Sequence, residues 1–276
     1  MLPASESRPP LDPRRLGSDV LPTGLLPGLR VEVVEATPST NADAAARAAA
    51  GEEPGLVLVT EHQTAGRGRL DRVWTTPPRA CLTFSTLLRP DVPMAHWPWL
   101  PLLTGYAVAA ALRTHLAVPG GPDPVGLKWP NDVLLDERKV AGILVERHEA
   151  PGGPVAVVGI GLNVTLRDDE LPVPHATSLL LAGGPVPDRE DLLLSVLAEL
   201  AAAYDAWRAE PTGSRLRASY AAACTTVGRR VRVELPVGPP LVGTAVDVDP
   251  GGRLVVDDGV VRRPVGAGDV VHVRPA

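Results

Sequence analysis

The chain has 276 residues, 45% of them hydrophobic, and a mean hydropathy near zero, which is typical of a globular protein with a real core. Its formal net charge of −5 argues against a nucleic-acid-binding protein, because such proteins usually present a basic surface. The two cysteines, Cys81 and Cys224, have no paired spacing, so they predict neither a disulfide framework nor a cysteine metal site. The six histidines are scattered without ligand spacing. We therefore expect a cytoplasmic protein in which no metal site is built by the protein alone.

The first 29 residues are rich in proline and arginine and show no helical or strand periodicity. They contain no basic segment followed by an apolar run, so they do not resemble a signal peptide. No stretch of the chain approaches the roughly 20 apolar residues that span a membrane. We interpret residues 1–29 as an extended or disordered lead-in, and we expect no membrane partner.

The first half of the chain alternates between strand and helix patterns. We expect a strand at 30–35, an alanine-rich helix at 42–50, and strands at 56–60 and 81–88 on either side of a basic loop. A long apolar pattern predicts a core helix from 94 to 116, which Pro98 and Pro101 could kink. The next strands are predicted at 125–129 or 132–135, at 140–147 and at 155–162. The short turn at 136–138 favours an antiparallel hairpin.

The second half of the chain contains two predicted helices followed by a run of short predicted strands. Helices are predicted at 188–209 and 213–222. After Gly228, five short β runs separated by Gly-Pro, Pro-Gly-Gly and Asp-Gly turns indicate a small barrel of about 50 residues. The predicted runs are 229–235, 241–248, 252–256, 259–263 and 269–273. The chain is therefore predicted to be an α+β protein, with one main domain and one small barrel.

The most informative stretch is the basic loop at 60–74. Arg67, Arg69 and Arg72 alternate with Gly66 and Gly68 between two apolar strands. Glycines let backbone N–H groups approach an anion, and guanidinium groups form bidentate bonds to phosphate or carboxylate. The loop lacks the lysine and the following helix of a P-loop. A phosphate-binding loop and a solvated basic surface loop both remain open on composition alone.

Five segments occur in order along the chain: STN at 39–41, QTAGRGR at 63–69, KWPND at 128–132, KVAGILVE at 139–146 and GIGLNV at 159–164. Together they resemble the biotin protein ligase family over residues 30–276. The resemblance implies a catalytic domain at 30–225, built on a mixed β-sheet flanked by helices as in class II synthetases and biotin and lipoate ligases. It also implies an SH3-like barrel at 226–276.

The resemblance implies two half-reactions. Biotin and ATP with Mg²⁺ would give biotinyl-5′-AMP and pyrophosphate, and the biotinyl group would then pass to one lysine of the biotin carboxyl carrier domain of an acyl-CoA carboxylase. The first step brings a carboxylate against a phosphate, two anions that repel unless cations neutralise them. Arg67, Arg69 and Lys139 can supply those cations, so we expect these three to be catalytic and we expect no essential nucleophile.

The resemblance also implies two sets of binding residues. The biotin-binding set is Ser39, Thr40, Asn41, Gln63, Gly66, Arg67, Gly68, Arg69, Lys139 and Gly142. The ATP-binding set is Arg69, Trp74, Lys128, Asn131, Asp132, Lys139 and Asn163, with Asp132 a candidate for Mg²⁺.

Several of these residues also have simpler explanations. Ser39 and Thr40 could have no role beyond capping a helix, and Lys139 could serve simply to protect a sheet edge. Asn131 and Asp132 could simply form a turn, and Trp74 could simply fill the core. Gly142 is unusual inside a strand and suggests close approach of another group, such as a bound biotin chain.

Three alternatives and one departure accompany the resemblance. A lipoate ligase or octanoyltransferase would share the fold class, a biotin-binding regulator would lack transfer activity, and an α/β protein with a fortuitous basic loop would carry no matching motifs.

Gly159 and Gly161 imitate a dinucleotide fingerprint, but Val164 stands where glycine is needed, so we reject a Rossmann site. Asp71 stands where the family often has glycine, and it could pair with a neighbouring arginine and reduce the positive field of the loop, which bears on loop flexibility and retention of the adenylate.

The family varies in two further properties. Some members carry an N-terminal winged helix that binds DNA; residues 1–29 are too short and too proline-rich for one, so we expect no nucleic-acid partner. A monomer and a homodimer are both compatible with the sequence.

Overall fold

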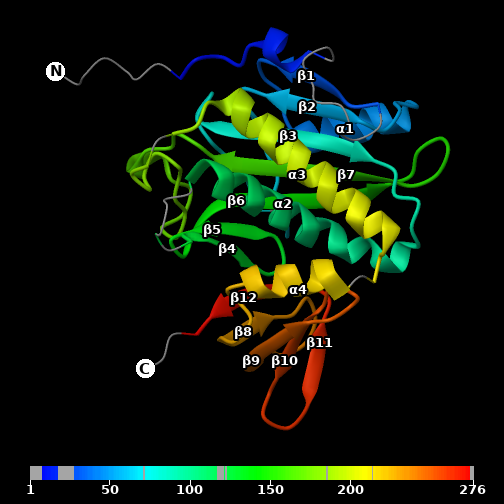
Figure 1. Cartoon of the computed structure of the whole chain (residues 1–276), viewed down its shortest axis with the longest axis vertical. Helices are drawn as coiled ribbons and strands as arrows, with labels where there is room; N and C mark the ends of the chain where they lie inside the picture. The colour runs from blue at the N-terminus through cyan, green and yellow to red at the C-terminus, as the bar shows by residue number, and fades with distance from the viewer. Residues whose placement is uncertain are drawn as a thin grey trace.

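The computed structural model describes residues 8–17, 28–70, 72–116, 121, 123–184, 186–212 and 214–273. Two sheets dominate it (Figure 1): a seven-stranded mixed sheet in the order β1-β2-β3-β7-β6-β5-β4, and a five-stranded antiparallel sheet in the order β11-β10-β9-β8-β12. The strands of the large sheet are β1 (Arg30–Val34), β2 (Leu56–Thr60), β3 (Cys81–Leu88), β4 (Val125–Lys128), β5 (Asp132–Leu135), β6 (Arg138–His148) and β7 (Val155–Asn163). Only β1 and β2 pair in parallel among these described strands.

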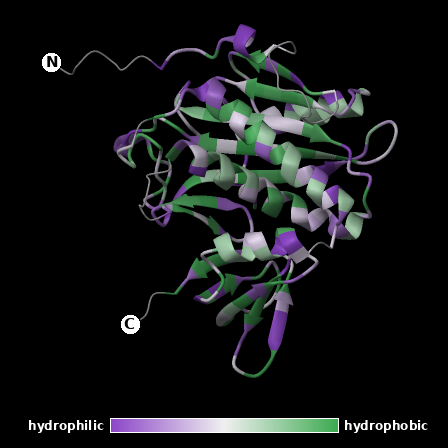
Figure 2. Cartoon of the chain, in the orientation of Figure 1, coloured by the Kyte–Doolittle hydropathy of each residue, from purple (hydrophilic) through white to green (hydrophobic). Residues whose placement is uncertain are grey.

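Helices cover both faces of the large sheet. Helices α2 (Leu100–Leu116) and α3 (Arg189–Ala209) pack together over one face, and α1 (Thr40–Ala49) lies against the other. Successive strand residues point to opposite faces, so β3 contributes Phe84 to the large core under α2 and Leu87 to the small core under α1. Every residue of β3 and β7 is buried, and Figure 2 shows these central strands as largely hydrophobic, with paler stretches between. The buried centre of the sheet is therefore a rigid support for the residues at the ends of its strands.

The small sheet follows helix α4 (Ser214–Ala223) and lies beside the β4 edge of the large sheet (Figure 1). Its strands are β8 (Arg230–Glu234), β9 (Leu241–Val248), β10 (Leu254–Asp257), β11 (Arg262–Val265) and β12 (Asp269–His272). Two buried indoles fix it in place: Trp129 Nε1 donates to Gly252 O at 3.0 Å, and Trp99 Nε1 donates to Pro250 O at 2.8 Å. Arg229 adds a bidentate ion pair with Glu137 of the large domain, at 2.5 Å and 2.6 Å.

Most predicted elements form, and the exceptions have local causes. The predicted helix at 94–116 is wrong in its first turns: Met94–Trp99 form the 3₁₀ helix η2, because Pro98 has no N–H to donate, and the α-helix starts at Leu100 with Pro101 in its first turn. Helix α1 starts two residues before the predicted position because Ser39 caps it. Both candidate strands near residue 130 exist, as β4 and β5. The predicted β5–β6 hairpin is confirmed, with Asp136 and Glu137 at positive φ in its turn.

Two barrel strands differ from their predicted ranges. The runs predicted at 252–256 and 259–263 form strands at Leu254–Asp257 and Arg262–Val265. Side-chain oxygens of Asp257 and Asp258 accept hydrogen bonds from the backbone N–H groups of residues 259, 260 and 261, at 2.8 to 2.9 Å. These bonds form a turn that takes residues 258–261 out of the strands.

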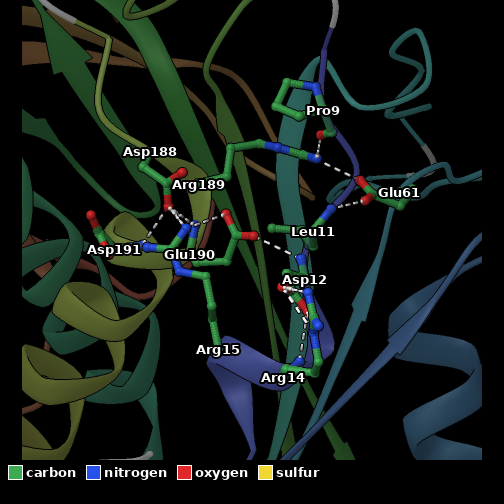
Figure 3. Close-up of polar contacts among 10 residues, drawn as sticks. All are labelled: Pro9, Leu11, Asp12, Arg14, Arg15, Glu61, Asp188, Arg189, Glu190 and Asp191. Atoms are coloured by element: carbon green, nitrogen blue, oxygen red, sulfur yellow. Dashed lines mark hydrogen bonds and ion pairs between the residues drawn. The ribbon is translucent and has the colours of Figure 1, made fainter.

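Residues 8–17 form a strap that packs on the main domain, although we predicted an extended or disordered lead-in. The strap contains a 3₁₀ helix, η1 (Pro13–Leu16), and buries Leu11 and Leu16. Figure 3 shows Arg189 between the strap and Glu61: its guanidinium donates to Pro9 O at 2.6 Å and forms a buried ion pair with Glu61 at 2.7 Å. Glu61 also accepts from Leu11 N at 2.5 Å, so the buried charges have the extra hydrogen bonds that such a pair requires.

Two further observations concern the predictions about the membrane, the lead-in and Asp71. No helix in the described ranges combines the length and hydropathy needed to cross a membrane. Residues 1–7 and 18–27 of the predicted lead-in, and Asp71 in the basic loop, lie outside the described residues.

Candidate active site

A cavity of about 590 Å³ lies over one end of the large sheet. It is bounded by the start of α1, the basic loop, the ends of β4 and β5, the strands β6 and β7, the segment 172–176 and strand β12 of the small sheet. The structure brings fourteen predicted site residues to its wall: Ser39, Thr40, Asn41, Gln63, Arg67, Gly68, Arg69, Trp74, Lys128, Asn131, Asp132, Lys139, Gly142 and Asn163. The predicted residue Gly66 is not on the wall. Its carbonyl accepts from Trp74 N at 2.9 Å, and a Cβ there would lie 2.5 Å from Gln63 Nε2.

One end of the cavity, which we name the neutral end, is lined by Ser39, Thr40, Asn41 and Gln63. Ser85, which is not on the wall, supports this end through hydrogen bonds to Thr40 and Asn41. All five are buried, with at most 8% of each residue exposed. Ser39 caps α1, and the next residue, Thr40, offers its N–H and its hydroxyl to Gln63 Oε1 at 2.9 Å and 3.1 Å. Helix capping and a place in the cavity wall therefore coexist in this segment. The side-chain oxygen of Gln63 accepts both hydrogen bonds from Thr40, which fixes the orientation of the Gln63 side-chain amide.

Asn41 is held from three sides. Its Nδ2 donates to Glu146 Oε2 at 2.7 Å, and its Oδ1 lies 2.6 Å from Ser85 Oγ. Gly159 stands beneath it, where a Cβ would lie 2.1 Å from Asn41 Oδ1. Ser85 and Gly159 are cross-strand partners on β3 and β7, so the sheet itself places the serine donor and the open space side by side. We did not predict roles for Ser85 or Glu146, although Glu146 ends one of the five sequence segments.

The basic loop folds as a small hairpin over the cavity. Gly68 N donates to Arg72 O at 2.7 Å, and residues 67 and 73 form an isolated antiparallel bridge. Trp74 then lies on a platform made by Gly142 and Gly161, which face each other across β6 and β7. A Cβ at Gly161 would lie 2.5 Å from the indole, and one at Gly142 would lie 3.1 Å from it. The glycines therefore make room for the indole of Trp74, whose Nε1 is buried without a hydrogen-bond partner among the described residues.

The opposite end of the cavity, which we name the cationic end, is formed by Arg69, Arg72, Lys128 and Lys139. Arg67 lies nearer the neutral end, because it shares the Glu146 carboxylate with Asn41. Lys139 Nζ lies 2.6 Å from Asp132 Oδ1 and 5.7 Å from the centre of the Trp74 ring. It is therefore held by a carboxylate below and by an aromatic face beside it. The Lys139 and Asp132 side chains are 21% and 19% exposed, so both charges are partly shielded from water.

The arginines of the loop each reach a different element. Arg69 donates to Asn131 Oδ1 at 3.1 Å and to Gly268 O at 3.3 Å, and burial lowers its pKa from the ordinary arginine value. Arg67, which is about half exposed, pairs with Glu146 at 3.2 Å. Arg72 forms a pair with Asp269 of β12 at 2.5 Å. Three loop cations are thus connected to three separate parts of the cavity wall.

Strand β12 contributes side chains that the sequence patterns did not single out. Asp269, Val270, Val271 and His272 all line the cavity. Burial, followed by the charges of Lys128 and Arg229, lowers the pKa of His272 to about 4, and its Nε2 lies 3.1 Å from Thr226 Oγ1. His175 is a further unpredicted wall residue, and burial followed by the charges of Lys128 and Lys139 lowers its pKa too. Both imidazoles are neutral near pH 7.

Asn131 and Asn163 serve as structural ties as well as wall residues. Asn131 Nδ2 donates to Ile143 O at 2.8 Å, which leaves its oxygen to accept from Arg69. Asn163 is 1% exposed, and its Nδ2 donates to Thr177 O at 2.8 Å. The peptide bond between Trp129 and Pro130, in the segment from Lys128 to Asp132, is cis.

The comparisons with known proteins agree with this geometry. Residues 33–164 match the model of the biotin/lipoate A/B protein ligase family, and residues 226–273 match that of the biotin protein ligase C-terminal domain. The biotin–[acetyl-CoA-carboxylase] ligase of Mycobacterium tuberculosis is 48% identical over 271 residues, which cover 97% of each chain. This chain belongs to the biotin protein ligase family.

Solved structures of the family share the fold. The biotin protein ligase of Aquifex aeolicus in complex with biotin and ATP matches at a TM-score of 0.72 and 27% identity, over 89% of this chain and 99% of that one. The ligase of Leishmania major in complex with biotinyl-5-AMP matches at a TM-score of 0.58 and 25% identity, over 91% and 100%. The predicted α+β class, with a mixed sheet and a C-terminal SH3-like domain, is confirmed.

Proposed function

We propose that this ligase activates biotin with ATP to give biotinyl-5′-AMP and pyrophosphate, and then transfers the biotinyl group to a lysine of the biotin carboxyl carrier domain of an acyl-CoA carboxylase. One observation carries the proposal: a single cavity has a neutral, hydrogen-bonding end and a cationic end, joined by an indole on a glycine platform. Biotin has the matching polarity, with a neutral ureido head, an apolar chain and a carboxylate. The mycobacterial relative is named for this activity.

The neutral end suits the ureido head. The groups there are uncharged hydroxyls and amides whose orientations are fixed by bonds to one another, such as Thr40 to Gln63 and Ser85 to Asn41. A buried polar site of this kind rejects ligands that leave its groups unpaired. Lipoate has a dithiolane ring and no ureido group, so it would leave these donors and acceptors unpaired. The neutral end therefore supports biotin over lipoate as the substrate.

The cationic end suits the reaction. Lys139 stands between the Trp74 platform and Asp132, so its ammonium can meet the biotin carboxylate and the α-phosphate together. Arg67 and Arg69 extend the positive charge along the loop, which lowers the repulsion between the two anions. No side chain forms a covalent bond in this scheme; the protein positions the reactants and stabilises the charge that develops.

ATP would bring Mg²⁺, and the chain offers a suitable ligand in Asp132. The described residues contain no group of three or more acidic, histidine or cysteine side chains that could hold a metal. Mg²⁺ accepts one or two carboxylates together with phosphate oxygens, so a single carboxylate beside the phosphates fits this ion. Asp132, which pairs with Lys139, would hold Mg²⁺, and the ion would neutralise phosphate charge.

Further parts of the proposal concern organisation and partners. We assign the catalytic domain to residues 30–225 and the barrel to 226–276, with β12 completing the cationic end of the cavity. We place the protein in the cytoplasm, where carboxylases and ATP are found, and we expect it to bind no DNA. The described strap at 8–17 shows no winged helix, and a gel shift with the biotin operator tests the expectation.

The first test is biotin-dependent exchange of labelled pyrophosphate into ATP by the purified protein, with lipoate as the control substrate. Exchange that requires biotin and ignores lipoate supports the adenylation step. A second assay adds a biotin carboxyl carrier domain and the same domain with its acceptor lysine changed to arginine. Biotin on the first domain and none on the second supports the transfer step, whereas exchange with lipoate alone would refute the proposed substrate.

A further inference from the structure

Glu146 places a negative charge behind the neutral end of the cavity. It lies on β6, does not line the cavity, and has 25% of its side chain exposed. One of its oxygens, Oε2, accepts from Asn41 Nδ2 at 2.7 Å and from Arg67 Nη2 at 3.2 Å. A residue of the buried polar network and a cation of the basic loop therefore share one carboxylate oxygen.

The carboxylate determines which way the Asn41 amide points. An ionised carboxylate only accepts hydrogen bonds, so it must face the nitrogen of the amide and not its oxygen. Asn41 Nδ2 also donates to Leu144 O at 3.3 Å, and Asn41 Oδ1 accepts from Ser85 Oγ at 2.6 Å. Both N–H bonds of the amide are thus used within the protein. What Asn41 can offer a ligand is the second lone pair of Oδ1, an acceptor suited to a ureido N–H.

The same carboxylate holds Arg67, but weakly. Arg67 lines the cavity, and 48% of its side chain is exposed. Ion pairs with this exposure change an equilibrium constant by about fivefold at most. A phosphate accepts two parallel bonds from a guanidinium and carries more charge than a carboxylate, so it can displace Glu146 from Arg67. Glu146 therefore competes with a bound phosphate for this arginine.

We propose that Glu146 is a positioning residue with opposite effects on the two substrates. It strengthens the binding of biotin because it fixes the Asn41 amide, and it lowers the apparent affinity for ATP because it competes with the phosphates for Arg67. The inference rests on the proposed adenylation activity. Glu146 itself touches no reacting atom; it acts through Asn41 on one substrate and through Arg67 on the other.

The first experiment uses Glu146→Gln, which keeps the size of the side chain and an acceptor for Asn41 but removes the charge that holds Arg67. The Kd of biotin is measured by calorimetry without ATP, and the KM of ATP is measured by pyrophosphate exchange at saturating biotin. Biotin should bind more weakly, by about tenfold at most, because a neutral oxygen is the poorer acceptor. The KM of ATP should fall by about two- to fivefold, because Arg67 is released.

A matched control and a stronger variant accompany this measurement. Glu149→Gln removes a carboxylate from the exposed Arg147–Glu149 pair at the end of the same strand, and it should change neither constant. Glu146→Leu offers Asn41 no acceptor at all, so biotin should bind about 10- to 100-fold more weakly. The Tm of each variant is measured first. If the leucine variant does not fold, the isosteric glutamine variant carries the test.

The second experiment asks whether the effect on ATP passes through Arg67. Glu146→Gln is combined with Arg67→Met, and the Kd of ATP is measured by calorimetry with biotinol, an alcohol that has no carboxylate to activate. In the Arg67→Met background, Glu146→Gln should leave the affinity for ATP unchanged. The same substitution should still weaken biotin binding in that background. Such a double-mutant cycle isolates the coupling between the two residues.

The signs of the two effects separate this inference from the proposed function and from a merely structural role. Absence of biotin-dependent exchange in the wild-type protein would refute the adenylation activity itself. If the wild type exchanges but Glu146→Gln weakens both substrates, or changes neither, the positioning role is overturned while the proposed function stands. A gain in ATP affinity that persists in the Arg67→Met background would overturn the competition for Arg67.

Discussion

The neutral and cationic ends of the cavity differ in how their polar groups are paired. At the neutral end, Thr40, Asn41, Gln63 and Ser85 are buried and form one hydrogen-bonded network, which Asn41 also ties to Glu146, and the buried Ser39 caps α1. At the cationic end, the side chains are partly exposed and bonded to carboxylates from other elements, as Lys139 is to Asp132 and Arg72 to Asp269. The neutral end is thus complete before any ligand arrives, whereas the cationic end holds its charges with groups that a phosphate can replace.

This difference follows from the cost of burying each kind of group. A hydroxyl or amide can be buried at little cost once it is hydrogen-bonded, so the neutral end can be rigid and selective. An unpaired cation cannot be buried cheaply, so Arg67, Arg72 and Lys139 remain partly exposed and pair with carboxylates. The rigid neutral end is expected to determine which carboxylic acid substrate binds. The cationic end, whose ion pairs can be replaced by a phosphate, is expected to determine how fast the bound substrate reacts. The following predictions test that division.

The largest effect is expected at the cationic end, from Lys139→Ala. The change removes the ammonium nearest the reacting anions and leaves the partly buried Asp132 without its partner. Loss of one such electrostatic group costs about 10²- to 10³-fold in rate. Biotin-dependent pyrophosphate exchange should fall by that factor, while the affinity for biotin changes less. Lys139→Arg serves as the control that keeps the charge; a loss below about tenfold in the alanine variant would contradict the assigned role.

The next effect is expected at the neutral end, from Gly159→Ala. A Cβ there would lie 2.1 Å from Asn41 Oδ1, so Asn41 must move and its bonds to Ser85 and Glu146 are disturbed. Overpacking of this kind costs about 1–3 kcal/mol, so biotin should bind about 5- to 150-fold more weakly in calorimetry. Gly105→Ala is the matched control, because a Cβ there meets its nearest atom at 3.5 Å and alanine favours a helix. Equal affinities in the two variants would remove the neutral end from biotin recognition.

An effect on stability is expected where the barrel meets the cavity. The pKa of His272 is lowered from 6.5 to about 4 by burial and nearby cations, so the folded state disfavours its protonation. The stability that this neutral imidazole contributes is fully present above pH 6.5 and is lost as the pH falls towards 4. The Tm of the wild type should therefore drop more steeply between pH 7 and pH 4 than that of His272→Gln. Parallel Tm curves for the two proteins would contradict the assigned burial.

The smallest effect is expected from Asp269→Asn, which breaks the contact between the loop and the barrel. The pair with Arg72 is partly exposed, with side chains 60% and 36% accessible, and such pairs contribute about 0–1 kcal/mol. Bound biotinyl-5′-AMP should leave the protein faster, by about fivefold at most. Asp258→Asn, which breaks an exposed pair with Arg263 on the outer hairpin, should leave that rate unchanged. A far larger effect of Asp269→Asn would show that the cationic end depends on this contact.

Local sequence patterns were sufficient for most of the elements. The strands at 56–60 and 81–88 form over the predicted residues, because continuous apolar runs bounded by turn residues specify a buried strand. The hairpin between β5 and β6 could be predicted from the length of its turn alone. The order of the five motifs was also sufficient to indicate the family and most wall residues of the cavity, since each motif contributes a short run that enters the site as a unit.

The tertiary structure decided which distant segments contact the motif residues. Asp269 and His272 stand about 130 residues beyond Lys139 along the chain, and only the docking of the barrel through Trp129 and Trp99 brings them to the wall. The strap at 8–17 has no periodicity of its own and is held by Arg189 and Glu61, which are distant in sequence.

The glycine platform shows the same limit. The sequence indicated that something must approach Gly142 closely, but not that Gly161 would stand opposite it or that Trp74 would cover both. Periodicity and turn chemistry act over a few residues, so the sequence by itself determined the elements and the motif residues of this ligase. Register between strands and the docking of one domain on another depend on contacts between distant segments, and these decided how the cavity is closed.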